Sequence, residues 1–259
     1  MDLRRPKEPK DRIIVPLDVP DIAQAIALVS LLGPYVGFFK IGLEFIWSMA
    51  ANLLLLPNED AVVLLSQIRS LAKTIGASRV FVDSKLDDIP NTVAGASAAI
   101  SRMGVAMFNV HASAGKEAVR AAVSAAKGRH SPSMVLGVTV LTSIAPEECV
   151  SIFGDKPDKK VVQFGQMLKD AGADGIICSP QELVPLAEAV PDLVRITPGV
   201  RPEWAAAGDQ KRIMTPADAI RAGAHLLVIG RPILKPPPEI DGPVEAAKRI
   251  AEEIAGALA

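Results

Sequence analysis

The stretch RVFVDSKLDDIPNTVAGASAAISRMGVAMFNV, residues 79–110, decides the fold. It begins with a short apolar run, RVFVD (79–83), and ends with a second, AMFNV (106–110). Between them, NTVAGASAAISRM (91–103) has helical spacing of its apolar residues. Two short buried strands on either side of a helix predict a βαβ unit, in which the strands run parallel.

The same alternation extends in both directions along the chain. Six more apolar runs are predicted strands: RIIVPL (12–17), GFFKI (37–41), MVLGVTV (134–140), GIIC (175–178), LVRIT (193–197) and HLLVI (225–229). Helical spacing recurs between and after them: DIAQAIALVSLL (21–32), EDAVVLLSQIRSLAKTI (59–75), GKEAVRAAVSAAK (115–127) and PVEAAKRIAEEIAGAL (243–258). Eight strand–helix repeats favour an α/β fold of the closed (β/α)8 TIM-barrel type. The pattern alone leaves an open doubly wound sheet possible.

Length and composition agree with one barrel. A TIM barrel takes roughly 250 residues, and this chain has 259, with no linker or change of composition to divide it. We therefore predict a single domain over residues 1–259, preceded by a charged N-terminal extension at 1–11. Apolar residues make up 49% of the chain and aromatic residues only 4%, so the predicted core is aliphatic.

The charge balance excludes several classes of partner. With 28 basic and 29 acidic residues, the chain has no electrostatic footprint for nucleic acid or an anionic membrane. The apolar stretch at 46–56 is shorter than the roughly 20 residues that span a bilayer. Cys149 and Cys178 do not form a disulfide framework, and Cys178 is predicted to be a buried thiol. No signal-peptide pattern follows the charged N-terminus, so we expect a cytoplasmic protein.

Polar residues follow or end all eight predicted strands. In strand order they are Asp18; Lys40; Asp83 and Lys85; His111; Thr142 and Ser143; Ser179; Thr197 and Pro198; Gly230 and Arg231. In a parallel barrel these strand ends share one rim, where barrel enzymes place their chemistry. The sequence therefore predicts a site at this rim.

The segment VFVDSKLDDIPNTV (80–93) carries the most specific chemical signal. Side chains alternate along a strand, so Asp83 and Lys85 are expected on the same side, with Asp88 nearby. A structural ion pair would also explain the spacing of these charges. However, a cation enclosed by carboxylates is costly to maintain, and such clusters recur where a proton is delivered to a carbanion.

The string DSKLDDIPNT (83–92) resembles the signature of the orotidine 5′-phosphate decarboxylase family. Six further motifs stand in the order expected for that family: LDVPD (17–21), FKIG (39–42), NVHASAG (109–115), LGVTVLTS (136–143), TPGVRP (197–202) and VIGRPI (228–233). The resemblance thus covers nearly the whole chain. It implies a TIM-barrel enzyme that converts orotidine 5′-phosphate to uridine 5′-phosphate in de novo pyrimidine biosynthesis, with no cofactor and no metal.

The resemblance also implies catalytic roles. Lys85 would protonate C6 of the pyrimidine, within a charge network completed by Lys40, Asp83 and Asp88. The protein would be a homodimer in which Asp88, Ile89 and Thr92 cross the interface, with Asp88 reaching the site of the neighbouring subunit.

Binding roles carry over in the same way. The resemblance assigns the ribose hydroxyls to Asp18 and Lys40, and the pyrimidine to Thr142, Ser143 and Pro198. It assigns the phosphate to Gly230 and Arg231, which suit it because glycine allows close approach and arginine offers a fork of donors. Residues 199–214 would form a lid over the phosphate, with Arg201 at its base and Gln210 reaching the ligand.

Three positions depart from the pattern or stay open. Asp87 stands where many family members have histidine. For His111 we expect a structural hydrogen bond in preference to catalysis. The segment 46–60 looks longer than the family's usual connection between the second strand and its helix.

Two other functions remain as alternatives. One is a Mg²⁺-dependent sugar-phosphate decarboxylase or aldolase of the same suprafamily, which would share the DxKxxD pattern but lack the DIPNT continuation and the glutamine-bearing lid. The other is a catalytically silent sensor of a nucleotide phosphate. The chain contains no GxGxxG after a strand, no P-loop and no zinc-spaced cysteine and histidine set.

Overall fold

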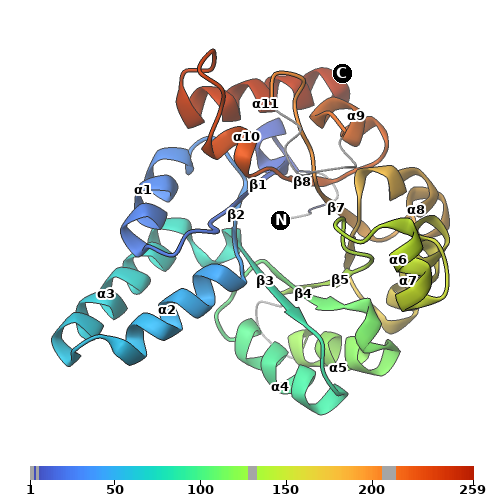
Figure 1. Ribbon diagram of the computed structural model, residues 1–259, viewed down its shortest axis with the longest axis horizontal. Helices are drawn as coiled ribbons and strands as arrows, with labels where there is room; N and C mark the ends of the chain where they lie inside the picture. Colours follow the sequence, from blue (N-terminus) through green and yellow to red (C-terminus); the bar gives the residue numbers. More distant parts are fainter. Residues whose placement is uncertain (1–2, 4–5, 128–132, 206–213) are drawn as a thin grey trace.

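The computed structural model describes residues 3, 6–127, 133–205 and 214–259, and its strands form a closed parallel barrel in the order β1 to β8 (Figure 1). The strands are β1 (Ile13–Pro16), β2 (Phe38–Ile41), β3 (Val80–Leu86), β4 (Met107–His111), β5 (Met134–Val138), β6 (Gly175–Ile177), β7 (Val194–Pro198) and β8 (Leu226–Val228). The barrel closes where Ile13 of β1 pairs with Leu227 of β8. All eight predicted strands are confirmed, and the open sheet is excluded.

Helices surround the barrel on its outside (Figure 1). They are α1 (Ile22–Leu32), α2 (Leu43–Leu55), α3 (Asn58–Ile75), α4 (Pro90–Ser101), α5 (Lys116–Lys127), α6 (Pro146–Phe153), α7 (Pro157–Ala171), α8 (Leu183–Ala189), α9 (Pro216–Arg221), α10 (Arg231–Leu234) and α11 (Gly242–Leu258). The five helical segments predicted from spacing correspond to α1, α3, α4, α5 and α11.

The core has two parts, one on each face of the barrel wall. The larger part fills the space between strands and helices, as Phe39, Phe108 and Leu168 illustrate. The smaller part fills the barrel itself with Ile14, Phe38, Phe81, Met107, Leu136, Val194, Ile196 and Leu226. Because both faces of each strand are buried, the strands read as continuous apolar runs.

The segment at the N-terminus is more than a charged extension. Leu3 is buried and packs within the group of residues inside the barrel. Pro9–Arg12 form a short 3-10 helix, and Arg12 donates a hydrogen bond to the carbonyl of His225 just before β8. These contacts attach the segment to the barrel.

Most of the segment 46–60, which looks long for this connection, is helix. Helix α2 covers residues 43–55 and α3 follows after Pro57, so that together they form a hairpin that projects from the barrel (Figure 1). The nearly uninterrupted apolar run concealed the helical period. Only Phe45 and Met49 of α2 are fully buried, while Trp47, Leu54 and Leu55 are exposed.

Two further sequence predictions can be compared with the described residues. Cys149 and Cys178 are both buried thiols. In the part of the chain that the structure covers, no helix combines the length and the apolar character needed to cross a bilayer.

Candidate functional site

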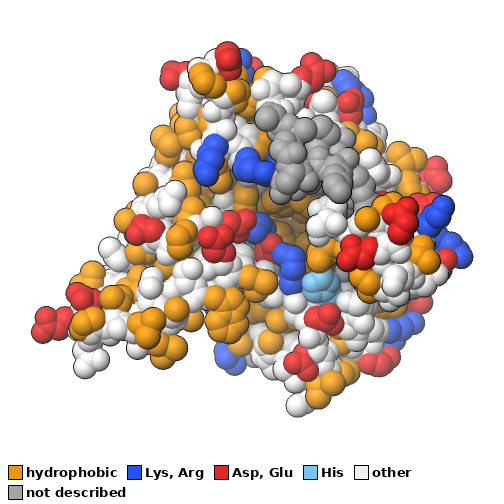
Figure 2. Space-filling view, in the orientation of Figure 1, with side chains coloured by type: hydrophobic (Ala, Val, Ile, Leu, Met, Phe, Trp, Pro, Cys, Tyr) orange, Lys and Arg blue, Asp and Glu red, His pale blue; other side chains and the backbone are white. Residues whose placement is uncertain are grey.

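Many of the predicted rim residues surround a hollow at one end of the barrel. Figure 2 shows this face, where basic and acidic side chains gather around the hollow. Two adjoining cavities occupy this end, and they share Lys40, Pro198 and Val228 as lining residues. The strand ends thus meet as the sequence predicts.

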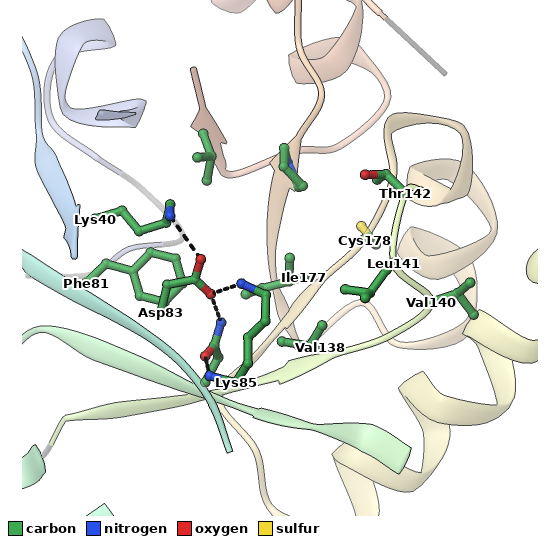
Figure 3. A pocket seen from close by; sticks show the side chains of 13 residues that line it. Lys40, Phe81, Asp83, Lys85, Val138, Val140, Leu141, Thr142, Ile177 and Cys178 are labelled. Carbon is green, nitrogen blue, oxygen red and sulfur yellow. Dashed lines mark hydrogen bonds and ion pairs between the residues drawn. The ribbon is translucent and has the colours of Figure 1, made fainter. Parts of the chain in front are cut away.

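A chain of alternating charges crosses the first cavity (Figure 3). Asp83 on β3 forms two ion pairs. Its Oδ1 lies 2.7 Å from Lys85 Nζ, and its Oδ2 lies 3.0 Å from Lys40 Nζ. Lys40 Nζ also lies 3.0 Å from Asp18 Oδ1. The order Asp18–Lys40–Asp83–Lys85 places an opposite charge beside each group. Lys40, Asp83 and Lys85 thus meet as expected, but within this chain Asp18, and not Asp88, continues the series.

Burial and ion pairing act against each other on the inner pair of this chain. Burial by itself would raise the pKa of Asp83, but Lys40, Lys85 and a hydrogen bond from Asn109 outweigh it and lower that pKa. For Lys40, burial would lower the pKa, but Asp83 and Asp18 outweigh it and raise the pKa. Both groups are therefore charged at neutral pH, and their charges create a permanent electric field in the site.

The backbone geometry that directs the Lys85 side chain towards Asp83 differs from the one predicted. The pairing of β3 with β4 changes register between Val82 and Leu86, which pair with Phe108 and Val110 respectively. Lys85 has φ 45°, and it is the one positive-φ residue other than glycine among the residues described. A bulge with a left-handed residue, not simple alternation along a strand, sets the direction of this side chain.

The first cavity has a volume of about 210 Å³ and is mostly apolar, apart from the charged groups, Asn109 and Thr142. Its other walls include Phe81, Val138, Leu141, Thr142, Ile177, Cys178 and Pro198 (Figure 3). A flat ring of mixed polarity would suit this space. Apolar walls lower the local dielectric constant, which strengthens the electrostatic interactions within the cavity.

The second cavity is wider, about 560 Å³, and more basic. Arg201, Arg231 and Lys235 line it with Gly199 and Gly230, and Asp18 lies where it meets the first cavity at Lys40. A hypothetical Cβ on Gly230 would come within 2.9 Å of the Pro16 ring, so a larger residue would not fit without a shift. This end of the site can hold a phosphate-sized anion.

Several predicted residues are placed differently. Ser143 lines a third cavity that shares Thr142 with the first. Asp88, Ile89 and Thr92 lie at the exposed start of α4, where Asp88 Oδ1 accepts a hydrogen bond from the Ile89 amide at 2.7 Å. The structure does not bring these three into either cavity of their own chain. Gln210 lies outside the described residues, as does half of the predicted lid, residues 206–213.

The two positions left open lie beside each other. Asp87 accepts a hydrogen bond from Ser113 Oγ at 3.4 Å. Burial, and also the charge of Lys85, lower the pKa of His111, while Asp87 and Asp83 partly oppose this shift. Among the described residues, we find no side-chain hydrogen bond of His111, so the structural hydrogen bond expected for it is not observed.

Sequence reasoning missed two residues that shape the site. Asn109 Nδ2 donates to Asp83 Oδ1 at 2.6 Å, and Asn109 Oδ1 accepts from the Lys85 amide at 2.6 Å. Gly42 leaves room for the ion pair of Asp18 and Lys40, because a Cβ there would lie 2.6 Å from Asp18 Oδ1. A polar residue inside the apolar run AMFNV, and a glycine directly after FKI, are the signals that could have identified them.

The chain is similar in sequence and in structure to known proteins. Residues 11–250 match the model of the orotidine 5′-phosphate decarboxylase / HUMPS family. The chain is 42% identical to orotidine 5′-phosphate decarboxylase of Moorella thermoacetica, covering 95% of this chain and 92% of the relative. It is also 42% identical to the Heliobacterium modesticaldum enzyme of the same name, covering 97% and 99%. A crystal structure of the Lactobacillus acidophilus enzyme matches with a TM-score of 0.72 and 29% identity, covering 93% and 98%.

Proposed function

Because the chain belongs to the orotidine 5′-phosphate decarboxylase / HUMPS family, we propose that it decarboxylates orotidine 5′-phosphate to uridine 5′-phosphate in pyrimidine biosynthesis. The observation that carries this proposal is the pair of adjoining cavities. One holds the Lys40–Asp83–Lys85 charge cluster between apolar walls, and the other holds two arginines beside Gly230. A nucleotide has the matching division into a ring and a phosphate, joined by a ribose at Asp18 and Lys40.

The reaction needs no group beyond these side chains. The bond from C6 to the carboxylate breaks, CO₂ leaves, and the electron pair stays on C6 until the Lys85 ammonium supplies a proton. Lys40 and Lys85 hold Asp83 ionised beside the reacting carbon. Charges positioned before the reaction can stabilise developing charge without reorganising. We therefore propose catalysis without cofactor or metal.

The remaining binding roles follow the two cavities. Thr142 and Pro198 line the ring cavity, with Ser143 adjacent to Thr142. Arg231, Gly230 and Arg201 line the phosphate cavity, and Gln210 is proposed to complete it from the lid at 199–214. Binding energy from the phosphate can then be used to orient a ring that reacts in the neighbouring cavity.

We further propose that the protein acts as a cytoplasmic homodimer in which Asp88, Ile89 and Thr92 complete the partner's site. The exposure of these residues supports this arrangement, since Ile89 is 66% exposed although it is large and apolar. Apolar surface also lies on the hairpin and just after α4, where Trp47, 68% exposed, and Met103, 55% exposed, line one cavity. Exposed apolar surface is typical of interfaces between proteins.

Complementation between inactive variants tests the shared site. Lys85→Ala and Asp88→Ala should each be inactive alone, while refolding the two together should restore up to about a quarter of the activity. In a dimer of one Lys85→Ala subunit and one Asp88→Ala subunit, one site carries both substitutions and the other site carries neither. The second site is therefore intact. A monomer by light scattering, or mixtures as inactive as the parents, would contradict the shared site.

Turnover of two substrates, each measured in EDTA and again in Mg²⁺, tests the function itself. The protein should consume orotidine 5′-phosphate, followed by its absorbance, and leave 3-keto-gulonate 6-phosphate unchanged. Metal-dependent turnover of the keto-sugar phosphate alone would favour the sugar-phosphate relatives. Tight binding of uridine 5′-phosphate with no turnover would identify a silent sensor.

A further inference from the structure

Asn109 is a polar side chain in an otherwise apolar part of the barrel wall. It lies in the middle of β4, between Phe108 and Val110, and all three residues are completely buried. Burying an amide is unfavourable unless its hydrogen bonds are satisfied. The two residues that satisfy this one are Asp83 and Lys85, the centre of the charge cluster.

The orientation of this amide is determined by its two neighbours. The Asp83 carboxylate accepts only, so the group 2.6 Å from Asp83 Oδ1 must be the amide NH₂ of Asn109. The Lys85 main-chain N–H donates only, so the group 2.6 Å from it must be the amide oxygen. Asn109 can thus serve both partners, whereas an aspartate of the same shape could serve only one.

The bulge in β3 explains why Lys85 needs such a partner. Between the paired positions Val82–Phe108 and Leu86–Val110, β3 advances four residues while β4 advances two. Strand pairing cannot supply partners for the extra residues. Asn109 supplies two hydrogen-bond acceptors to the bulge instead. Its side chain accepts from the Lys85 amide, and its main-chain carbonyl accepts from Ser84 Oγ at 2.8 Å. The bond to the Lys85 amide holds Lys85 in its left-handed conformation.

We propose that Asn109 is a positioning residue that locks the Lys85 main chain and the Asp83 carboxylate into one rigid unit, so that the Lys85 ammonium is held at the reacting carbon. The role rests on the proposed decarboxylation. All three donors to Asp83 are then fixed: Lys85 and Asn109 at Oδ1, and Lys40 at Oδ2. Because a displacement of about 1 Å in a reacting group can cost a hundredfold in rate, loss of this unit should impair the chemical step more than binding.

Three variants separate the two bonds of Asn109. Asn109→Asp keeps the acceptor for Lys85 but replaces the donor to Asp83 by a carboxylate. Asn109→Ala removes both bonds, and Asn109→Ser provides a smaller change if the alanine variant does not fold. Ser84→Ala is the matched control, because it removes a hydrogen bond from the same bulge without touching Asp83 or the Lys85 amide.

We expect kcat per uridine 5′-phosphate binding site to fall roughly a hundredfold or more in Asn109→Asp and Asn109→Ala, in line with a misplaced catalytic group. KM should change less than kcat, and Ser84→Ala should stay within a few-fold of the original protein. The acid limb of the kcat–pH profile should move to higher pH in Asn109→Asp, because the new carboxylate faces Asp83. A kcat within threefold of the original in both Asn109→Asp and the folded alanine or serine variant would overturn the proposal.

A second measurement does not depend on turnover. Carbon-13 NMR of the aspartate carboxylates, assigned through Asp83→Asn, should show Asp83 titrating at higher pH in Asn109→Ala or Asn109→Ser than in the original protein. Titration at the same pH would show that Asn109 does not hold this carboxylate. An original protein that leaves orotidine 5′-phosphate unchanged yet shows the NMR shift would reject the proposed reaction while supporting the link between Asn109 and Asp83.

Discussion

Lys85 Nζ lies 2.7 Å from Asp83 Oδ1 across a bulge that interrupts the pairing of β3 with β4. Lys85 adopts a left-handed conformation at this point, which costs a residue other than glycine about 1–2 kcal/mol. Strain of this kind is retained where the surrounding structure stabilises it, and functional sites are such places. The bulge directs the ammonium into the cavity that also contains Lys40 and Asp83.

The ion pair of Asp18 and Lys40 should depend on the absence of a side chain at Gly42. In Gly42→Ala, the added Cβ would lie 2.6 Å from Asp18 Oδ1 and 2.9 Å from Lys40 Nζ. We expect KM for orotidine 5′-phosphate to rise roughly tenfold or more, the size of one lost charge-assisted hydrogen bond. Steady-state kinetics measure this. Gly256→Ala is the control, because nothing lies within 4 Å of a Cβ at that position on α11; an unchanged KM in Gly42→Ala would contradict the steric argument.

Arg231 should act on the phosphate alone. Arg231→Ala should raise KM for orotidine 5′-phosphate by about 10- to 100-fold, because one or two charge-assisted hydrogen bonds are lost. Reaction of the nucleoside orotidine, which has no phosphate, should be equally slow with and without the substitution. Arg249→Ala is a matched control, since Arg249 pairs with Glu245 on α11. Equal losses on both substrates would place Arg231 outside the phosphate site.

Stability should depend on pH at both ends of the range. The pKa of Asp83 is lower in the folded protein than its ordinary value of 3.8. Its contribution to the free energy of unfolding is therefore fully present above the pKa of the unfolded state, and is lost as the pH falls through the pKa of the folded state. The pKa of Lys40 is raised above its ordinary value of 10.5. The stabilisation that Lys40 contributes is therefore fully present below the pKa of the unfolded state, and is lost as the pH rises through the pKa of the folded state. Denaturant unfolding at a series of pH values measures both effects. Asp83→Asn should flatten the acid limb, and an unchanged acid limb would be inconsistent with this assignment.

Two buried serines on α4 should be dispensable for stability. Ser97 Oγ and Ser101 Oγ are buried and have no hydrogen-bond partner among the residues that the structure describes. Ser97→Ala should therefore raise the free energy of unfolding by about 0.5–1 kcal/mol, through better helix propensity and removal of an unsatisfied polar group. The exposed Ser66 on α3 supplies the comparison, since Ser66→Ala changes propensity alone. Thermal and denaturant unfolding would measure both, and destabilisation by Ser97→Ala would indicate a hydrogen bond that matters.

Much of the barrel could be predicted because its strands are buried on both faces and therefore appear as short apolar runs. The rim could be predicted for a related reason, since polar residues that end parallel strands must meet at one edge. The α2–α3 hairpin was harder to predict, because the apolar run at 46–56 shows no clear polar face. Trp47, Leu54 and Leu55 are exposed there, so hydrophobicity did not indicate burial.

The details of the charge cluster depend on contacts that no local pattern contains. Asn109 is 24 residues from Lys85 and 26 from Asp83, yet it bonds both. The spacing of Asp83 and Lys85 correctly predicted that they meet, but for the wrong geometric reason, because alternation along a strand does not hold through a bulge. The roles of Asp88, Ile89 and Thr92 stay predictions, since they concern a second subunit.

The most direct test of the account is the absorbance of orotidine 5′-phosphate in EDTA, measured with the purified protein and with Lys85→Ala. The account predicts rapid loss of substrate with the original protein and nearly none with the variant, which should still bind uridine 5′-phosphate through the basic cavity. Turnover by Lys85→Ala within tenfold of the original rate would contradict the assignment of Lys85 as the proton donor. An original protein that leaves the substrate unchanged would contradict the proposed reaction.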